Sequence, residues 1–322
     1  MRGVEFHRRR AAAGRRTGIR SVGAPAGAAA AGPVVRRSDE RSAERPMNRR
    51  RPPRSASAEE LLTTLQQLTS RARRQVELHQ ARVELAEVIQ REMLPAALPA
   101  RPGLQTAARY TPARSGLDIG GDWYDGFVLP DGALAFAIGD VQGHDVEAAA
   151  FMGQVRIAMR AIAATATDPG EVVGRTNDLL VSAGSGLFAT CTFVRLDPES
   201  RELHSARAGH VAAVWATADG RCGVTSDEGG LPLGIQAGEE YPVTRRRLTD
   251  PGAFVLVTDG VVEGPSFPID RGLETVTRLV RARVGADAGE LADAVLRAAE
   301  QTGHQDDAAV LVIRHGTGAG HF

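Results

Sequence analysis

The amino-acid sequence predicts an α+β fold, with sheets in the middle and helices on the outside. Helical runs come in two pairs between groups of apolar, strand-like runs, which is the pattern expected of this class. The strand-like runs are 133–140, 187–197, 202–210, 211–217, 253–260 and 309–316, and the helical runs are 146–165, 170–183, 271–284 and 288–301. Two runs, 187–197 and 201–208, are joined by Asp197-Pro198-Glu199-Ser200, which predicts an antiparallel hairpin.

The composition allows a sizeable core and argues against several classes of protein. Apolar residues make up 43% of the chain but aromatic residues only 4%, so Leu, Val, Ile and Ala must fill the core. The two cysteines, Cys191 and Cys222, cannot build a disulfide framework, and neither belongs to a CxxC zinc motif. Cys191 is interpreted as a small buried hydrophobe. No stretch approaches the roughly 18–20 apolar residues of a membrane span, and we expect a soluble cytoplasmic protein.

Residues 1–54 differ from the rest of the chain in charge. They hold 15 arginines and 4 acidic residues, a formal charge of +11, so the remainder of this neutral chain carries −11. The segment has almost no large apolar residues and is predicted to be disordered. It could be a basic arm for nucleic acid, but we favour a dispensable leader, with Met47 as the true start.

Residues 55–94 predict one long amphipathic helix. Ser57 is suited to cap it, Glu59 and Glu60 stand in its first turn, and Pro95 ends it. Its apolar or small residues recur every three or four positions: Leu61, Leu65, Leu68, Ala72, Val76, His79, Val83, Ala86, Ile89 and Met93. A single narrow stripe needs a partner. A homodimeric coiled coil is the first candidate, and packing on the chain's own following domain is the alternative.

Four acidic motifs are tied to predicted strands. They are Gly-Gly-Asp122-Trp-Tyr-Asp125, Gly139-Asp140-Val-Gln-Gly143-His144, Thr258-Asp259-Gly260 and Asp306-Asp307. Asp140 and Asp259 follow apolar strands, whereas Asp122 and Asp306 precede strands. A carboxylate at a strand end is held in place, and neighbouring glycines allow a ligand to approach the backbone closely. Any single motif of this kind is more often an ordinary turn, but four together indicate a site.

Four carboxylates that meet at one edge of the sheets need a cation. Two unit charges 4 Å apart repel by about 4 kcal/mol at an effective dielectric constant near 20. The chain has no lysine, and arginine is not interleaved with the motifs. Oxygen-only ligands favour Mg²⁺ or Mn²⁺. Two such ions could deprotonate a bridging water, which is a suitable nucleophile for the slow hydrolysis of a phosphate monoester.

The motifs GGDWYD, GDVQGHD, TDGVVEG and DDAAVLVIR, in this order and spacing, resemble the PPM-type serine/threonine phosphatases. The similarity is greatest to the bacterial branch of sporulation protein E and RsbU-like phosphatases, and it covers roughly residues 85–315. The resemblance implies an αββα sandwich of two antiparallel sheets with a binuclear metal centre between the sheet edges. We assign residues 95–316 to this phosphatase domain and residues 317–322 to a disordered tail.

The resemblance also implies a role for each matched residue. Asp140 would bridge two Mn²⁺ or Mg²⁺ ions, and the backbone carbonyl of Val141 would ligate one of them. Asp122, Asp259 and Asp306 would complete the ligands, with Asp306 preferred over Asp307. The implied substrate is a phosphorylated regulatory protein of the anti-anti-sigma type. The rival interpretation is a catalytically silent domain of the same fold that sequesters this partner.

Other residues near the motifs carry two interpretations each. His144 could protonate the leaving seryl oxygen as a catalytic acid, or it could shape the turn. Gln142 and Asp145 depart from the residues usual in the family, and Asp145 could cap the helix that follows. His210 is predicted to be structural. The remaining assignments are Asp125 and Glu263 as turn or supporting residues, and Arg245, Arg246 and Arg247 as a solvated strand edge.

Overall fold

The computed structural model describes residues 57–112, 120–143, 146–303 and 306–316. The chain divides into two units, Met1–Ser57 and Ala58–Phe322, and the helices and strands given below lie in the second unit. The predicted disordered segments 1–54 and 317–322 fall outside the described residues, so their assignment stays a prediction.

The described strands form two antiparallel sheets of five strands each. The first has the order β1-β10-β9-β6-β7, and the second has the order β2-β3-β4-β5-β8. The first comprises β1 (Leu104–Thr111), β10 (Ala308–His315), β9 (Gly252–Val257), β6 (Val214–Thr217) and β7 (Cys222–Val224). The second comprises β2 (Trp123–Val128), β3 (Leu134–Val141), β4 (Ala189–Leu196), β5 (Glu202–Ala208) and β8 (Val243–Arg247).

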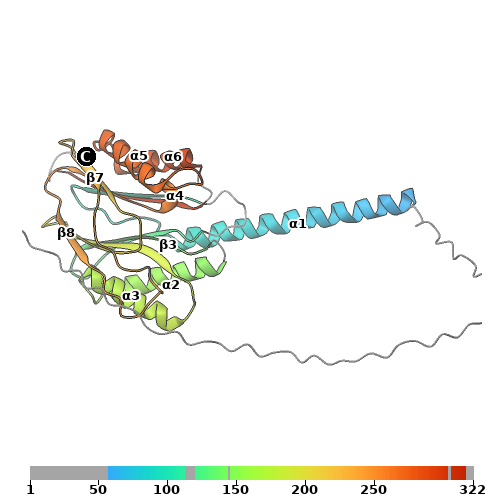
Figure 1. Cartoon of the computed structure of the whole chain (residues 1–322), viewed down its shortest axis with the longest axis horizontal. Helices are drawn as coiled ribbons and strands as arrows, with labels where there is room; N and C mark the ends of the chain where they lie inside the picture. Colours follow the sequence, from blue (N-terminus) through green and yellow to red (C-terminus); the bar gives the residue numbers. More distant parts are fainter. Residues whose placement is uncertain (1–56, 113–119, 144–145, 304–305, 317–322) are drawn as a thin grey trace, which may run out of the picture. The chain divides into compact units, whose positions relative to one another are not determined.

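Helices cover the outer face of each sheet, which confirms the predicted αββα sandwich (Figure 1). Those on the second sheet are α2 (Val146–Ala163) and α3 (Pro169–Ala183). Those on the first sheet are α5 (Ile269–Ala282) and α6 (Ala288–Ala299), with the short α4 (Asp259–Val262) and the 3₁₀ turn η1 (Glu300–Thr302) beside them. The helix α1 (Ala58–Met93) precedes the sandwich in sequence.

Three apolar cores explain why the central strands are apolar on both faces. Along β9, Val255 and Val257 face the core under α5 and α6, whereas Phe254 and Leu256 lie in the core between the sheets. Along β3, Phe136 likewise faces the other sheet while its neighbour faces α2. Successive side chains of a strand point to opposite faces, so a strand buried on both sides has no polar alternation.

The hairpin predicted at residues 187–208 is present, but the following strand is shorter than expected. β4 and β5 pair antiparallel, and the Asp197 side chain accepts hydrogen bonds from the backbone N–H groups of Glu199 (2.8 Å) and Ser200 (3.2 Å). β5 ends at Ala208 because Gly209 adopts a φ of 63°, a left-handed conformation that ends the extended run. β6 then begins only at Val214.

The described side chains of α1 before residue 79 are exposed. Several large apolar ones are each more than half exposed: Leu61, Leu62, Leu65, Leu68, Val76 and Leu78. The C-terminal end of the helix is different, because Met93 packs against the core under α2 and lies close to Gly153 of that helix. Within the described chain, no helix is both long enough and apolar enough to cross a membrane.

Asp125 ties β2 to α2 and takes no part in the acidic cluster. Its carboxylate is buried and forms ion pairs with Arg160 and Arg156, with nitrogen–oxygen distances of 2.8 Å and 3.7 Å. It also accepts a hydrogen bond of 2.8 Å from the backbone N–H of Gly126. The Arg160 guanidinium stacks 4.6 Å from the centre of the Phe127 ring. Asp125 therefore supports the sandwich by anchoring a helix to its sheet.

Candidate metal centre

Three of the predicted aspartates meet where the two sheets come together. One carboxylate oxygen from each of Asp122, Asp140 and Asp259 lies within 4.8 Å of the others. Asp122 stands directly before β2, Asp140 is the penultimate residue of β3, and Asp259 follows β9 and opens α4. The second sheet thus supplies two carboxylates and the first sheet supplies one, each at a strand end where the backbone is fixed by pairing.

Thr258 joins the two sheets at this point. Its hydroxyl donates to Oδ2 of Asp122 at 2.7 Å and accepts from the backbone N–H of Ala309 at 2.8 Å. Thr258 and Asp122 are both buried. A threonine hydroxyl can donate one hydrogen bond while it accepts another, so Thr258 fixes the Asp122 carboxylate against β10. Thr258 was not singled out from the sequence, although its place directly before Asp259 is the available signal.

Gly121 allows the backbone to approach the cluster closely. A Cβ atom at this position would lie 2.5 Å from the carbonyl oxygen of Val141 and 3.1 Å from Oδ1 of Asp140. Any side chain would therefore collide with the carbonyl that the sequence assigns to the site. The backbone N–H of Val141 also donates to the carbonyl of Gly121 at 3.2 Å. The glycine before Asp122 keeps the Val141 carbonyl and the Asp140 carboxylate side by side.

Burial and mutual repulsion disfavour the charged forms of these carboxylates. Burial, followed by the charges of Asp259 and Asp306, raises the pKa of Asp140 to about 8. The pKa of Asp122 is raised well above its ordinary value by burial and by the charge of Asp140, against the opposing hydrogen bond from Thr258. The pKa of Asp259 is raised by burial and by the charge of Asp306. A cation bound among the three carboxylates would favour their charged forms and lower their pKa values.

The residues present fit a divalent ion. Among the described residues, no arginine forms an ion pair with Asp122, Asp140 or Asp259. The converging donors are carboxylate oxygens with a backbone carbonyl close by, which is the donor set that Mg²⁺ and Mn²⁺ prefer. Three desolvated carboxylates without a cationic partner form an arrangement that a hard cation stabilises.

The final acidic pair is divided between the surface and the interior. Asp306 is exposed, and its carboxylate accepts a hydrogen bond of 2.8 Å from the backbone N–H of Asp307. Asp307 is buried, and a Cβ atom on Gly120 would lie only 1.8 Å from its Oδ2. Both charges raise the pKa of Asp140, so both lie near the cluster. Neither belongs to the three-carboxylate group found among the described residues.

The structure describes some of the predicted histidines and supporting residues and leaves others undescribed. His144 and Asp145 lie outside the described residues, so the catalytic role of His144 stays a prediction. His210 is buried, and its Nδ1 lies 2.9 Å from the hydroxyl of Thr190. Burial lowers the pKa of His210 to about 3, so the ring is neutral and structural. Glu263 follows α4, and its charge helps to raise the pKa of Asp259.

The arginine run at residues 245–247 is only partly a solvated edge. β8 is the edge strand of the second sheet, and Arg245 and Arg247 are exposed. Arg246 points between the sheets instead, where it pairs with Asp227 and lies 6.0 Å from the centre of the Phe254 ring. The alternation of the strand decides which arginine is solvated.

Known proteins are similar to this chain in sequence and in fold. The chain is 26% identical over 182 residues to phosphoserine phosphatase RsbU of Bacillus subtilis, a match that covers 56% of this chain and 53% of RsbU. The crystal structure of the RsbU and RsbW domains of Rv1364c from Mycobacterium tuberculosis superposes with a TM-score of 0.64 at 28% identity. That superposition covers 71% of this chain and 64% of the other.

A second similar structure contains metal ions. It is the catalytic domain of the serine/threonine protein phosphatase PstP in complex with two manganese ions, with a TM-score of 0.51 and 18% identity over 66% of this chain and 99% of that one. At this identity the likeness shows the fold. Residues 130–316, more than half of the chain, match the family of stage II sporulation protein E (SpoIIE). The chain therefore belongs to the SpoIIE family, as the four acidic motifs predicted.

Proposed function

We propose that this protein is a metal-dependent phosphatase that hydrolyses phosphoserine or phosphothreonine on another protein. The observation that carries the proposal is the meeting of Asp122, Asp140 and Asp259 within 4.8 Å at the junction of the sheets. Two divalent ions, Mn²⁺ or Mg²⁺, would be held by these carboxylates, with Asp306 and the Val141 carbonyl as further ligands. Bound there, such ions supply a Lewis acid and an activated water for attack on phosphorus.

The residues of the chain contribute by holding these groups in fixed positions. Thr258 keeps Asp122 in one orientation through its 2.7 Å hydrogen bond. The backbone N–H of Gly260 donates to Oδ1 of Asp259 at 2.8 Å, which fixes the third carboxylate. Burial of Asp122 excludes water from one side of the cluster. Groups held before the substrate arrives need no reorganisation during the reaction.

The proposed substrate is a phosphorylated regulatory protein of the anti-anti-sigma type, in the cytoplasm. The support is the membership of the SpoIIE family and the similarity to RsbU, which is a phosphoserine phosphatase. The chain spans about half of the length of RsbU, so the relative supports the reaction class more strongly than the identity of the substrate.

Phosphate release by the full-length chain should require metal. With a phosphoserine-containing protein as substrate, we expect turnover at about 1 mM Mn²⁺ or Mg²⁺. In EDTA the rate should fall by about 10³-fold or more, because the carboxylates alone supply no nucleophile. The measurement is phosphate released per enzyme and time. Metal-independent turnover would contradict the assignment. Tight binding of the phosphoprotein without turnover would favour the catalytically silent alternative.

We propose that α1 pairs with α1 of a second copy to form a homodimer. The described part of the helix exposes Leu61, Leu65, Leu68, Ala72 and Val76, which are spaced three or four residues apart as in a coiled-coil seam. Each of these side chains is more than half exposed, so no described part of the chain covers it. A helix with one apolar stripe is stabilised when a second helix buries that stripe.

Leu65→Glu should weaken this dimer by at least about 100-fold, since each dimer loses two buried leucines and gains two opposed charges. The measurement is molar mass by light scattering over a dilution series. Gln66→Glu is the matched control, because it adds the same charge one position away from the stripe and should leave the dimer intact. A monomeric wild-type chain, or equal effects of both substitutions, would contradict the proposed interface.

A further inference from the structure

An open groove of about 490 Å³ runs between β7, which is the edge strand of the first sheet, and helix α5. Leu273 and Thr277 of α5 line it on one side, and Cys222 and Val224 of β7 line it on the other. We call this surface the β7–α5 groove. None of its lining residues belongs to the acidic cluster. An extended peptide can add a strand to a sheet at an open edge of this kind.

The outer edge of β7 presents backbone groups that can receive such a strand. At the end of the β6–β7 ladder, the N–H of Thr225 donates to the carbonyl of Ala213 at 2.8 Å. Hydrogen-bonded and non-hydrogen-bonded pairs alternate along an antiparallel ladder, so Cys222 and Val224 direct their N–H and C=O groups away from β6. Among the described residues, no hydrogen bond reaches these outward groups.

The side chains of β7 leave this edge accessible. Cys222 packs against the core under α5, and Val224, two residues along the strand, faces the same side and is 38% exposed. The three residues of β7 carry no charge, whereas the edge strand β8 of the other sheet carries three arginines. Charged side chains on an edge discourage the addition of a further strand. β7 has no such protection, and its shortness limits pairing to a short segment.

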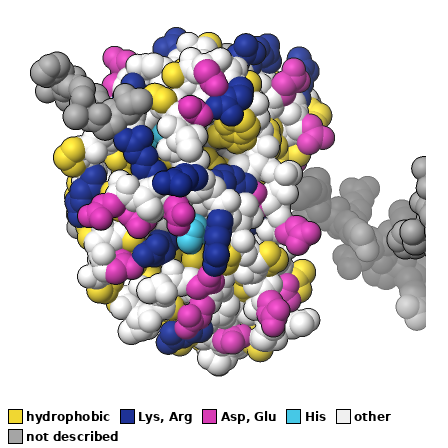
Figure 2. All heavy atoms as spheres, turned by 90° about the vertical axis from the view of Figure 1, so that its left-hand side faces the viewer, with side chains coloured by type: hydrophobic (Ala, Val, Ile, Leu, Met, Phe, Trp, Pro, Cys, Tyr) yellow, Lys and Arg dark blue, Asp and Glu magenta, His cyan; other side chains and the backbone are white. Residues whose placement is uncertain are grey.

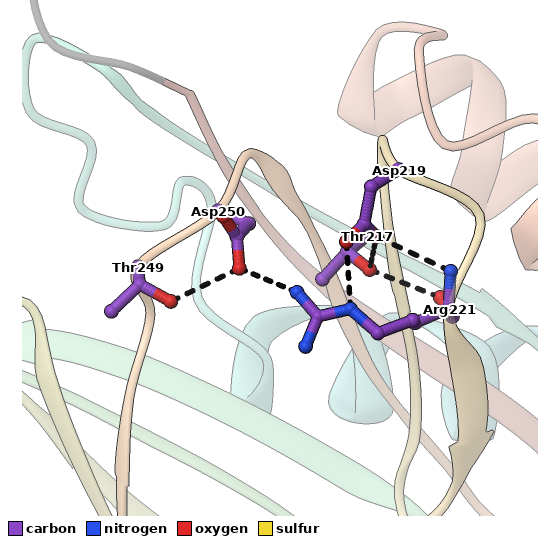
Figure 3. Close-up of polar contacts among 5 residues, drawn as sticks. All are labelled: Thr217, Asp219, Arg221, Thr249 and Asp250. Carbon is purple, nitrogen blue, oxygen red and sulfur yellow. Dashed lines mark hydrogen bonds and ion pairs between the residues drawn. The ribbon is translucent and has the colours of Figure 1, made fainter.

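The turn that leads into β7 is held rigidly, as Figure 3 shows. Arg221, the residue before the strand, donates to Asp219 at 2.7 Å and to Asp250 at 2.5 Å. The hydroxyl of Thr217 also donates to Asp219. The start of the edge is therefore fixed before a ligand arrives, which lowers the entropy cost of binding.

The α5 side of the groove is polarised in charge. Acidic side chains, Glu274 among them, line its first half, whereas Arg278 and Arg281 line its second half. These three residues are exposed, and none forms an ion pair with a described residue. Figure 2 shows the side of the molecule on which Figure 1 labels β7, and charges of both signs are interspersed there. A complementary partner therefore carries both signs, in a fixed order.

The direction of this order follows from how α5 lies beside β7. A Cβ atom on Gly220, just before the strand, would lie 3.9 Å from a guanidinium nitrogen of Arg281. The arginines thus lie beside the start of β7, and Glu274, seven residues earlier, lies about 10 Å away along the helix axis. A strand antiparallel to β7 ends where β7 begins. Its C-terminal end would meet Arg281, its N-terminal end would meet Glu274, and three or four extended residues would span the distance.

From this arrangement we infer that the β7–α5 groove binds an extended segment of another protein, which pairs antiparallel with β7. The segment carries a basic residue, then two apolar residues at alternate positions, then an acidic residue. The apolar side chains would lie against Leu273 and Thr277, and the backbone would bond to Cys222 and Val224. Main-chain hydrogen bonds supply affinity in this mode of recognition, and the alternate side chains supply specificity.

The probe is a fluorescently labelled peptide, Ser-Lys-Val-Thr-Val-Glu-Ser, added to the full-length chain. Fluorescence anisotropy at about 0.03 M salt, where charges are little screened, should show saturable binding of one peptide per chain below about 1 mM. A peptide with Lys and Glu exchanged has the same composition and apolar centre. It should bind at least about tenfold more weakly, because both of its charges face like charges.

Substitutions in the protein locate the peptide. Arg281→Glu should weaken binding of the first peptide at least about fivefold, since it replaces one attraction by a repulsion. Arg283→Glu is the matched control, because Arg283 is exposed near the end of the same helix but does not line the groove. Glu274→Arg combined with Arg281→Glu should invert the preference, so that the exchanged peptide binds more tightly.

Backbone methylation tests the strand pairing itself. Residues opposite Cys222 and Val224 direct their N–H groups at β7 and their side chains at α5, so these are the two valines of the probe. N-methylation of both valines removes two hydrogen-bond donors and should weaken binding at least about tenfold. N-methylation of the threonine between them is the control, and it should change binding by no more than about threefold because that N–H faces away.

Four results would overturn the inference. They are no saturable binding up to about 1 mM peptide, equal binding of the exchanged peptide, equal effects of methylation at valine and at threonine, and equal effects of Arg281→Glu and Arg283→Glu. A molar mass that falls on Arg281→Glu would show that a second copy of the chain fills the groove, which also contradicts the inference. None of these readouts depends on phosphatase activity.

Discussion

Asp140→Asn is expected to abolish phosphatase activity, with a loss of at least about 10³-fold in kcat, or about 4 kcal/mol of transition-state stabilisation. A carboxylate oxygen of Asp140 lies within 4.8 Å of those of Asp122 and Asp259, and the Val141 carbonyl is close by, so the charge of Asp140 acts on any ion that the site holds. Asparagine keeps the size of the side chain at position 140 and removes its charge. The measurement is phosphate release at saturating Mn²⁺.

The control for this substitution is Asp270→Asn, an equal change of charge on the exposed first turn of α5. It should leave kcat within about twofold, as surface substitutions usually do. Circular dichroism would show that both variants are folded. Full activity of Asp140→Asn would mean that the cluster is not the catalytic centre, and the proposed function would fail with it.

The metal-free protein should lose stability as the pH rises from 6.5 to 8. The folded pKa of Asp140 is about 8, against an ordinary value of 3.8, so the folded chain keeps a proton that the unfolded chain has released. The unfolded state then binds fewer protons, and the free energy of unfolding falls with increasing pH. Asp122 and Asp259 are shifted in the same direction. We expect a loss of about 2 kcal/mol over this window.

The buried histidines oppose this decrease only in the lower part of the window. The pKa values of His210 and His315 are lowered from 6.5, so these rings stabilise the folded state as the pH rises through about 6.5, and this gain is nearly complete by about pH 7.5. Above that pH, the aspartates dominate the change in stability. The midpoint of thermal unfolding in EDTA should fall by about 4–8 °C between pH 6.5 and 8.

Two comparisons make this result specific. In Asp140→Asn most of the decrease should disappear, because the group that titrates has been removed. With Mn²⁺ present the wild type should also lose the decrease, since a bound cation favours the ionised carboxylates. An equal decrease in the wild type and in Asp140→Asn would show that the pH effect arises elsewhere in the molecule.

The elements with strong local signals could be predicted from the sequence. Helix α3 follows Asp168, whose side chain accepts from the N–H groups of Gly170 and Glu171, and it ends at Gly184 with a φ of 66°. The runs 253–260 and 309–316 are recognised as strands because they are apolar, although β9 ends at Val257 and Asp259 opens α4. Of the short edge strands, β8 is predicted only through its arginine run, and β7 carries no prediction, since so few residues give no periodic signal.

The sequence by itself determined that aspartates stand at strand ends and that glycines accompany them, because both are local properties of the chain. Only the tertiary structure decided which carboxylates meet. It brings Asp122, Asp140 and Asp259 together through two different sheets, and it places Asp307 inside and Asp306 at the surface. Distance between carboxylates depends on how the sheets pack, and no local pattern encodes that packing.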